Sequence, residues 1–390
     1  MKKSILALTA ALIHLPAARQ TGTFQLSDLQ EGGQYGGLTI AEFGVPNALA
    51  VADALTVRYN QQLTQNIMTI AEVTTERYDV ENVAGGMRMR RTSEYSNTET
   101  QRGGTIEGRG FPLISNGIAT GWTEHFDQIA TVGAFTAMTL GAQAANDTQI
   151  REDLAQSLYD NQERPLYESL KLDSRLPLEM VTGVKVKPLY NGDGEVPPPS
   201  PMGKRFDGTH NHYLSSDGLT NTAVEALAQT VGEHSVGNRI VIEINEADAG
   251  TFRNLTGFVP ATVAQVIPGA NQAATSVNLD VTQTDNRLIG YTAGGHPVWT
   301  KPWAIAGYAV ASNRNGPRAI KMRVPKQAVL RGLRLKGQEG NTVLKAQTWE
   351  SIFGFGASNR GGAAVLQFGN FSAGNATKAY EKPVLPGDDE

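Results

Sequence analysis

A run of 19 residues without a charged side chain, from Gln128 to Asn146, constrains the fold more than any other stretch. Gly133, Ala137, Gly141 and Ala145 recur in it every four residues, which places small side chains in one stripe along a helix. Larger apolar side chains surround this stripe. The sequence therefore predicts a helix that is buried on most of its sides.

The predicted helix runs from Thr123 to about Leu172. Thr123 is a suitable N-cap, and Glu124 and Asp127 place negative charge in the first turn, where it complements the helix dipole. Asn146 and Asp147 form a predicted capping pair inside the stretch, after which the pattern becomes amphipathic. Pro165 is expected to end or kink the helix.

A charge-free run of this length also matches a membrane span. However, three threonines, two glutamines and an asparagine interrupt it, and few large apolar side chains drive insertion. A helix packed between protein layers is the preferred interpretation.

The chain of 390 residues is long enough for two or three domains, and 40% of it is hydrophobic. A net charge of −4 gives no overall basic character that would favour nucleic-acid binding. There are no cysteines, so disulfides, thiolate metal sites and cysteine nucleophiles are excluded.

The first 20 residues allow two interpretations. Lys2 and Lys3 followed by an apolar stretch resemble a secretory signal peptide. Alternatively, Ile5, Leu8, Leu12 and Leu15 have heptad-like spacing, which suits an arm that lies on a partner. We expect the arm.

Residues from Thr69 to Leu113 are polar, with short alternations and several glycines, and predict a long β-hairpin. A hairpin with so little core is not stable alone in water, so it must lie on another surface. One alternative is a solvated, salt-bridged arm. The other, which we favour, is an arm that pairs with a neighbouring subunit.

The remaining elements are predicted from periodicity and turn residues. They are a helix over Asn47–Ile67, a strand pair over Leu176–Tyr190, a helix capped by Asn221, a buried strand over Arg239–Asn245, a helix between Asn245 and Gly257, a long loop over Ala261–Asp285, a hairpin of Leu288–Ala293 and His296–Lys301, a third strand over Ala304–Ala311, and a second hairpin of Thr342–Phe355 and Ala363–Phe368.

Candidate chemistry is sparse. His210 and His212, with Asp207 nearby, could hold a metal, but their spacing is a poor match to structural zinc sites. Trp299 and Trp303 could line a sugar site, although core or interface positions fit them better. No catalytic motif occurs, so we expect no enzyme activity, no catalytic residues, no cofactor and no metal.

Three stretches resemble the Hong Kong 97-type major capsid proteins of tailed bacteriophages (Caudoviricetes). They are GFPLISNGIATGWTEHF (Gly110–Phe126), IGYTAGGHPVWTKPWAIAGYAVA (Ile289–Ala311) and GFGASNRGGAAVLQFG (Gly354–Gly369). The order of the predicted elements along nearly the whole chain resembles this family as well.

The resemblance implies an α+β, Hong Kong 97-type capsid fold. Its implied parts are an N-terminal arm and helix (1–68), an extended β-hairpin loop (69–113), a peripheral domain with a long spine helix (114–214), an axial α/β domain (215–322), and return strands of the peripheral domain with a C-terminal tail (323–390).

The implied function is that of a structural protein that self-assembles, as pentamers and hexamers, into an icosahedral shell around viral DNA. The shell would form in the host cytoplasm and become part of the virion. Further candidate partners are scaffold, portal and cementing proteins. The chain would enclose DNA without sequence-specific binding and would not contact a membrane.

Some members of the family join subunits by an isopeptide bond from an extended-loop lysine. This chain has no lysine between Lys3 and Lys171, so that bond cannot form from this loop. We therefore expect non-covalent inter-subunit contacts through five arginines: Arg88, Arg90, Arg91, Arg102 and Arg109.

Two alternatives remain open at this point. The main one is a secreted or surface β-rich binding protein with an N-terminal signal peptide. The other is a glycan-active enzyme that uses the tryptophan-containing hairpin.

Overall fold

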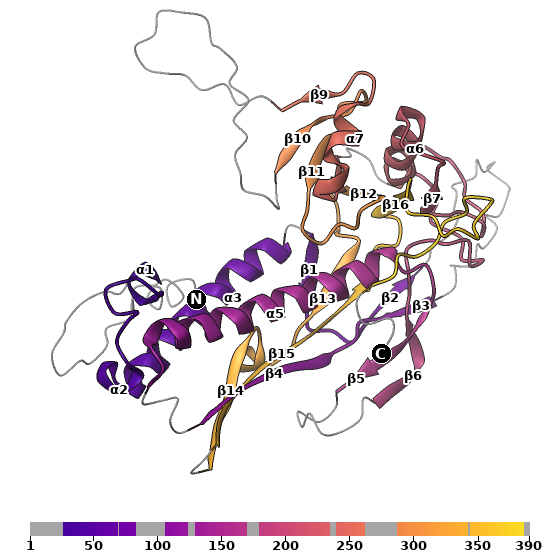
Figure 1. Cartoon of the computed structure of the whole chain (residues 1–390). Helices are drawn as coiled ribbons and strands as arrows, with labels where there is room; N and C mark the ends of the chain where they lie inside the picture. The colour runs from indigo at the N-terminus through magenta and orange to yellow at the C-terminus, as the bar shows by residue number, and fades with distance from the viewer. Residues whose placement is uncertain are drawn as a thin grey trace, which may run out of the picture.

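The computed structural model describes eight stretches of the chain: residues 26–68, 70–82, 106–123, 129–169, 179–234, 239–261, 287–341 and 344–385. They form a mixed α+β structure with two long helices, shorter helices and three sheets (Figure 1). The predicted arm in the first 20 residues lies outside these stretches, and the predicted loop over Ala261–Asp285 lies almost entirely outside them.

The longest helix, α5, spans Val132–Tyr159 and contains most of the charge-free run. Its N-cap is Thr131, whose side chain accepts a hydrogen bond from the Ala134 N–H. The Val132 and Gly133 N–H groups donate to the backbone oxygens of Leu38 and Gly36. These partners satisfy the open end of the helix and fix its start.

The predicted boundaries of this helix are therefore wrong at both ends. Thr123 ends strand β4 (Ile114–Thr123) and is not an N-cap. Asn146 and Asp147 lie inside the continuous helix, which ends before Asp160. Pro165 lies in strand β5 (Arg164–Glu168), at an edge of its sheet, where a missing N–H is tolerated.

The predicted stripe of small residues is not one buried seam. Gly133 packs against backbone of the segment 31–36, where an added Cβ would lie 3.0 Å from the Glu31 nitrogen. Ala137 and Gly141 are exposed, and nothing lies within 4 Å of a Cβ placed on Gly141. Helix α5 thus presents one uncharged face to solvent in the single chain.

Helix α3 (Val45–Met68) confirms the predicted N-terminal helix and runs beside α5 (Figure 1). The short helices are α1 (Leu26–Leu29), α2 (Ile40–Phe43), α6 (Asn221–Gly232) and α7 (Ala249–Arg253), with the 3₁₀ turns η1 (Glu246–Asp248) and η2 (Ala328–Leu330). The N-cap of α6 is Thr220, one residue before the predicted Asn221. Within the residues that the structure describes, no helix is long and apolar enough to cross a membrane.

The first sheet is built on β15 (Leu344–Ala357), the longest strand in it. Three strands pair with it antiparallel: β4, β14 (Arg334–Asn341) and β13 (Ile320–Arg323), and β1 (Ala71–Thr74) adds to β13 in parallel. Trp349, Phe353 and Phe355 of β15 are buried in the cores formed with α5 and α3. In Figure 1, β4, β14 and β15 form one long ribbon below these two helices.

The second sheet has seven strands, in the order β7-β16-β12-β8-β11-β10-β9. Their bounds are Tyr213–Ser215, Ala363–Gln367, Tyr308–Asn313, Ile240–Ile244, Pro297–Thr300, Leu288–Tyr291 and Val259–Pro260. Helices α6 and α7 pack on this sheet and bury Leu227 and Phe252. The buried strand, the helices and the hairpin predicted for this region are confirmed.

The second predicted hairpin, Thr342–Phe355 with Ala363–Phe368, is wrong. Strand β15 belongs to the first sheet, whereas β16 lies inside the second sheet between β7 and β12. All five residues of β16 are buried, so its two edges and both of its faces need partners that one neighbouring strand cannot supply. The segment Ser358–Gly362 carries the chain from one sheet to the other.

The third sheet has the order β2-β3-β6-β5, with β2 spanning Tyr78–Asn82, β3 spanning Ile106–Gly110 and β6 spanning Glu179–Val186. Strands β2 and β3 are antiparallel, with Tyr78 opposite Gly110 and Asn82 opposite Ile106. This pair confirms the base of the predicted hairpin. Strand β1 is not part of it, because β1 pairs with β13.

Candidate functional site

The base of the β2–β3 hairpin is the part of the chain where the sequence and the structure together point to a functional surface. Strand β2 is the outer strand of its sheet, and its Tyr78 and Val80 side chains are about half exposed, at 49% and 55%. Residues 83–105, which join the two strands, lie outside the described structure. The base of the hairpin itself is held in place by contacts with the rest of the chain.

Three ion networks hold it. In the first, Arg109 of β3 contacts Glu195 at 3.3 Å and donates to the Ser358 backbone oxygen. Both side chains are at most 5% exposed. Their mutual attraction is little screened by water, so it fixes β3 to the loop that follows β6.

Arg360 continues this network from the turn between β15 and β16. Its side chain is completely buried; it pairs with Glu195 and with Asp193 at 2.8 Å, and it donates to the Pro188 backbone oxygen at 2.7 Å. Burial by itself lowers the pKa of Arg360, but Glu195 and Asp193 more than offset this and hold the pKa above its usual value. One cation thus fixes the loop 188–195 against both large sheets.

The second network joins the third sheet to the first. Glu168 of β5 contacts Arg77 at 2.8 Å and Arg323 of β13 at 2.7 Å. Arg323 also donates to the Phe111 backbone oxygen at 3.0 Å. These contacts hold the chain on both sides of the hairpin base, immediately before β2 and after β3.

The third network fixes β2 itself. Asp79 pairs with Lys321 of β13 at 2.6 Å and accepts a hydrogen bond from the Ser358 hydroxyl at 2.8 Å. The inward-facing side chain of β2 is therefore bound to the body of the protein, while Tyr78 and Val80 on either side of it face solvent. This alternation is the two-residue period of a strand.

The five arginines that we expected to contact another subunit fall into two groups. Arg88, Arg90, Arg91 and Arg102 lie outside the described residues. Arg109 is 2% exposed and bound within its own chain, so the expectation is corrected for this residue. Its place in β3, on the inward face of the strand, explains the difference.

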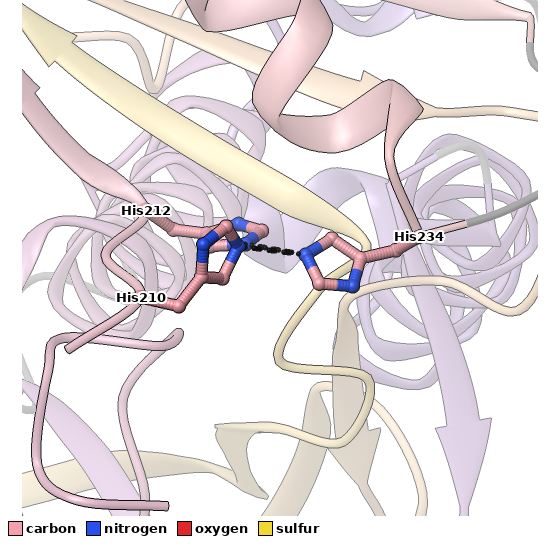
Figure 2. A group of neighbouring side chains, drawn as sticks. All are labelled: His210, His212 and His234. Carbon is pink, nitrogen blue, oxygen red and sulfur yellow. Dashed lines mark hydrogen bonds between the residues drawn. The ribbon is translucent and has the colours of Figure 1, made fainter. Parts of the chain in front are cut away.

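The structure also brings His210 and His212 together with His234, which the sequence did not suggest (Figure 2). Asp207 does not join them, because its carboxylate accepts hydrogen bonds from Thr209 instead. Burial lowers the pKa of all three imidazoles, that of His234 to about 4, so they are neutral at pH 7. His234 is 22 residues from His212 in sequence, and no local pattern pairs them.

Trp303 lies in the core, with 5% of its surface exposed. A core position was one of the two interpretations that the sequence left open for it. Trp299 lies partly buried in β11 under the Lys301 ammonium, 5.4 Å from its ring centre. Neither tryptophan gives support to a sugar site.

Comparison with solved structures finds chains with a similar fold. A chain of the structure titled "Mycobacterium phage Patience" matches 95% of this chain and 97% of its own length, at 19% identity and a TM-score of 0.61. Another match is titled "Capsid of native GTA particle computed with C5 symmetry", at 13% identity, 78% and 90% coverage and a TM-score of 0.46. A third is titled "Gordonia phage Cozz", at 12% identity, 78% and 86% coverage and a TM-score of 0.42.

No protein-family model and no curated protein sequence matches the chain. The similarity is therefore one of fold. In the first match this fold is shared over nearly the full length of both chains.

Proposed function

We propose that the chain is the major capsid protein of a tailed bacteriophage and that its copies form an icosahedral shell of pentamers and hexamers around viral DNA. The observation that carries the proposal is the fold shared with the protein of Mycobacterium phage Patience over 95% of this chain. A structural role needs no catalytic site, and none is proposed.

In this proposal the parts of the chain have the layout of a Hong Kong 97-type subunit. Strands β2 and β3, with residues 83–105, are the extended loop that lies over a neighbouring subunit. Helix α5 is the spine helix, and the unit around the seven-stranded sheet is the axial domain at the centre of each capsomer. The exposed Tyr78 and Val80 at the base of the loop support the first assignment, because apolar side chains of this size gain by burial against a second copy.

The charge of the chain is compatible with a container for DNA. The net charge is −4, so the protein has no overall attraction for a polyanion. Phosphate contacts add up steeply in affinity, and a wall that bound DNA tightly would hinder both packaging and release. The proposed place of the protein is the shell of the virion, after assembly in the host cytoplasm, with scaffold, portal and cementing proteins as candidate partners.

Sedimentation velocity of the full chain, purified without a tag, tests the proposal. Rings of five and six subunits, or fast-sedimenting shells, are expected rather than a 41.8 kDa monomer. A matched variant replaces residues 84–104 by a short Gly-Ser linker. This variant should keep the folded body and lose the shells, because the described base is held by its own ion networks.

A monomer at every protein concentration, also with a crowding polymer present, would count against a shell protein. That result would favour the secreted binding-protein alternative. The mass of the mature chain tests this alternative, because removal of a signal peptide lowers the mass. Shells that form equally well without residues 84–104 would leave the shell role intact and reject the loop assignment.

A further inference from the structure

Three histidine side chains converge beside the seven-stranded sheet, although they come from two separate segments of the chain. His210 and His212 immediately precede β7, and His234 follows the end of α6. Their Nε2 atoms form a near-equilateral triangle, with distances of 3.1 Å (210–212), 2.9 Å (210–234) and 3.0 Å (212–234) (Figure 2). All three rings point to the same small space.

Hydrogen bonds among the three rings cannot account for this arrangement. The Nδ1 atom of His212 lies 2.6 Å from the Ala363 backbone oxygen, which only accepts, so the His212 proton is on Nδ1 and its Nε2 carries a lone pair. Two neutral partners can then supply at most two protons for three Nε2 contacts. At least one pair of Nε2 atoms therefore faces each other at about 3 Å without a shared proton.

A metal ion resolves this conflict because it accepts all three lone pairs at once. Zinc–imidazole bonds of 2.0–2.1 Å in a tetrahedral site separate the ligand nitrogens by about 3.3 Å. The observed triangle is smaller than this by only a few tenths of an ångström. A backbone oxygen that holds the second nitrogen of a ligand histidine, as Ala363 holds His212, is the usual support of such a site.

The triangle is enclosed on several sides, mostly by apolar groups. His212 is completely buried, whereas His210 and His234 are half-buried, which leaves one side open for entry. The Phe206 ring lies over both of these, with ring centres 4.4 Å and 4.6 Å apart. The Gly361 backbone closes another side so tightly that a Cβ there would lie 2.8 Å from the His234 ring.

The donor set selects the class of ion. Three neutral imidazoles suit zinc, cobalt, nickel or copper, whereas calcium and magnesium prefer oxygen ligands. Of the charged groups nearby, Glu233 is paired with Lys204 at 2.5 Å, and the Asp207 carboxylate is bound to Thr209. Within the described residues, no carboxylate belongs to the group.

We propose that His210, His212 and His234 form a binding site for a divalent transition-metal ion, with zinc as the expected ion and a water molecule in the fourth position. The ion would tie the end of α6 to the strand β7 and so brace one edge of the seven-stranded sheet. The site is complete within one chain, so the proposal stands independently of the proposed shell.

Metal titration of the tag-free full chain, after dialysis against a chelator, tests this site. Co²⁺ alone is the first probe, because a four-coordinate Co²⁺ ion absorbs visible light strongly. One equivalent per chain is expected, displaced by Zn²⁺, together with a rise of several degrees in the melting temperature of the chain. X-ray absorption of the zinc-loaded chain should count three imidazole nitrogens, and this measurement needs no variant.

His210→Gln and His234→Gln remove one ligand each at half-buried positions. Each should weaken binding at least ~100-fold, because even the loss of a supporting second-shell group costs about 10–100-fold. His296→Gln is the matched control: this histidine lies outside the cluster, near Glu225, and its loss should leave binding unchanged.

The proposal is overturned if the wild-type chain takes up no Co²⁺ or Zn²⁺, or if X-ray absorption finds fewer than three imidazole ligands. Equal affinity of His234→Gln and wild type would also overturn it, since the ion would then be an adventitious one held at the surface.

Discussion

Arg360 is a cation that is enclosed entirely by its own chain. Its partners Asp193 and Glu195 are more than 160 residues away along the chain. The cluster Asn359-Arg360-Gly361-Gly362 is typical of an exposed turn, and we predicted it as the turn of a hairpin. Only the packing of the two large sheets around it converts that turn into an interior position.

Replacing Arg360 tests its role. Arg360→Met should lower the free energy of unfolding by about 3–5 kcal/mol, because it leaves the buried Glu195 carboxylate with too little compensating charge. Arg253→Met on α7 is the control, since Arg253 is exposed and its loss should change stability by less than about 0.5 kcal/mol. Urea unfolding at pH 7 measures both, and a loss below 1 kcal/mol for Arg360→Met contradicts this role.

Asp153 gives a residue-scale prediction for pH. Burial raises its pKa to about 6, although Gln149 and Arg164 pull the pKa down. The folded state therefore holds a proton on Asp153 between about pH 4 and 6 that the unfolded state releases, so the contribution of this group to stability falls as pH rises through that window.

Asp153→Asn removes this effect. The variant should match the wild type near pH 4 and exceed it by about 1–3 kcal/mol at pH 7. Chemical unfolding at both pH values measures the difference. A gap between the two proteins that is the same at both pH values would show that burial does not control this carboxyl.

At the scale of elements, hydrophobic period was a good guide to the existence of helices and strands and a poor guide to their ends and partners. The long helix, α3 and the fully buried strand β8 follow directly from their patterns. The start of α5 does not, because it depends on the oxygens of Gly36 and Leu38, about 95 residues earlier in the chain. Likewise, residues 114–123 are extended because all ten pair with β15.

Two glycines of α5 allow one substitution to be compared at two sites. Gly141→Ala adds a methyl group in open space and should stabilise the chain by about 0.5–1 kcal/mol, since alanine favours the helix. Gly133→Ala places the methyl group 3.0–3.1 Å from the Glu31 nitrogen and the Gly36 oxygen, both backbone atoms. It should destabilise the chain by about 1–3 kcal/mol.

Thermal unfolding of the two variants measures the contrast. If Gly133→Ala is as stable as Gly141→Ala, the segment 31–36 does not pack against α5 as described here.

At the scale of the whole molecule, the order of elements along the chain indicated the mixed α+β architecture that the structure has, whereas the candidate sites needed the structure. Arg109 was expected at a subunit interface and lies inside the chain, and His234 was not considered at all. Both depend on contacts between distant segments, which a local motif does not report. The helices and strands could be predicted because each of them has a local pattern of apolar and polar residues.

The arginines of the loop carry a prediction for the assembled state. Arg90→Ala with Arg91→Ala should lower the melting temperature of the shell and leave that of the unassembled chain unchanged, because these side chains are proposed to meet acidic partners only in the shell. Each exposed ion pair contributes only about 0–1 kcal/mol. The expected fall in the melting temperature of the shell therefore depends on the many copies of these pairs in it.

Calorimetry of shells and of unassembled chains separates the two states. Arg205→Ala with Arg253→Ala, at exposed positions outside the loop, is the control. Shells of the loop variant that assemble and melt like the wild type would reject a role for these arginines.

The most direct measurement is an electron cryomicroscopy reconstruction of the purified, assembled protein. We predict a closed icosahedral shell in which the seven-stranded sheets surround the five- and six-fold centres and the β2–β3 loop lies over the adjacent subunit. An open filament, an unassembled monomer, or a shell in which the loop stays on its own subunit would contradict this account.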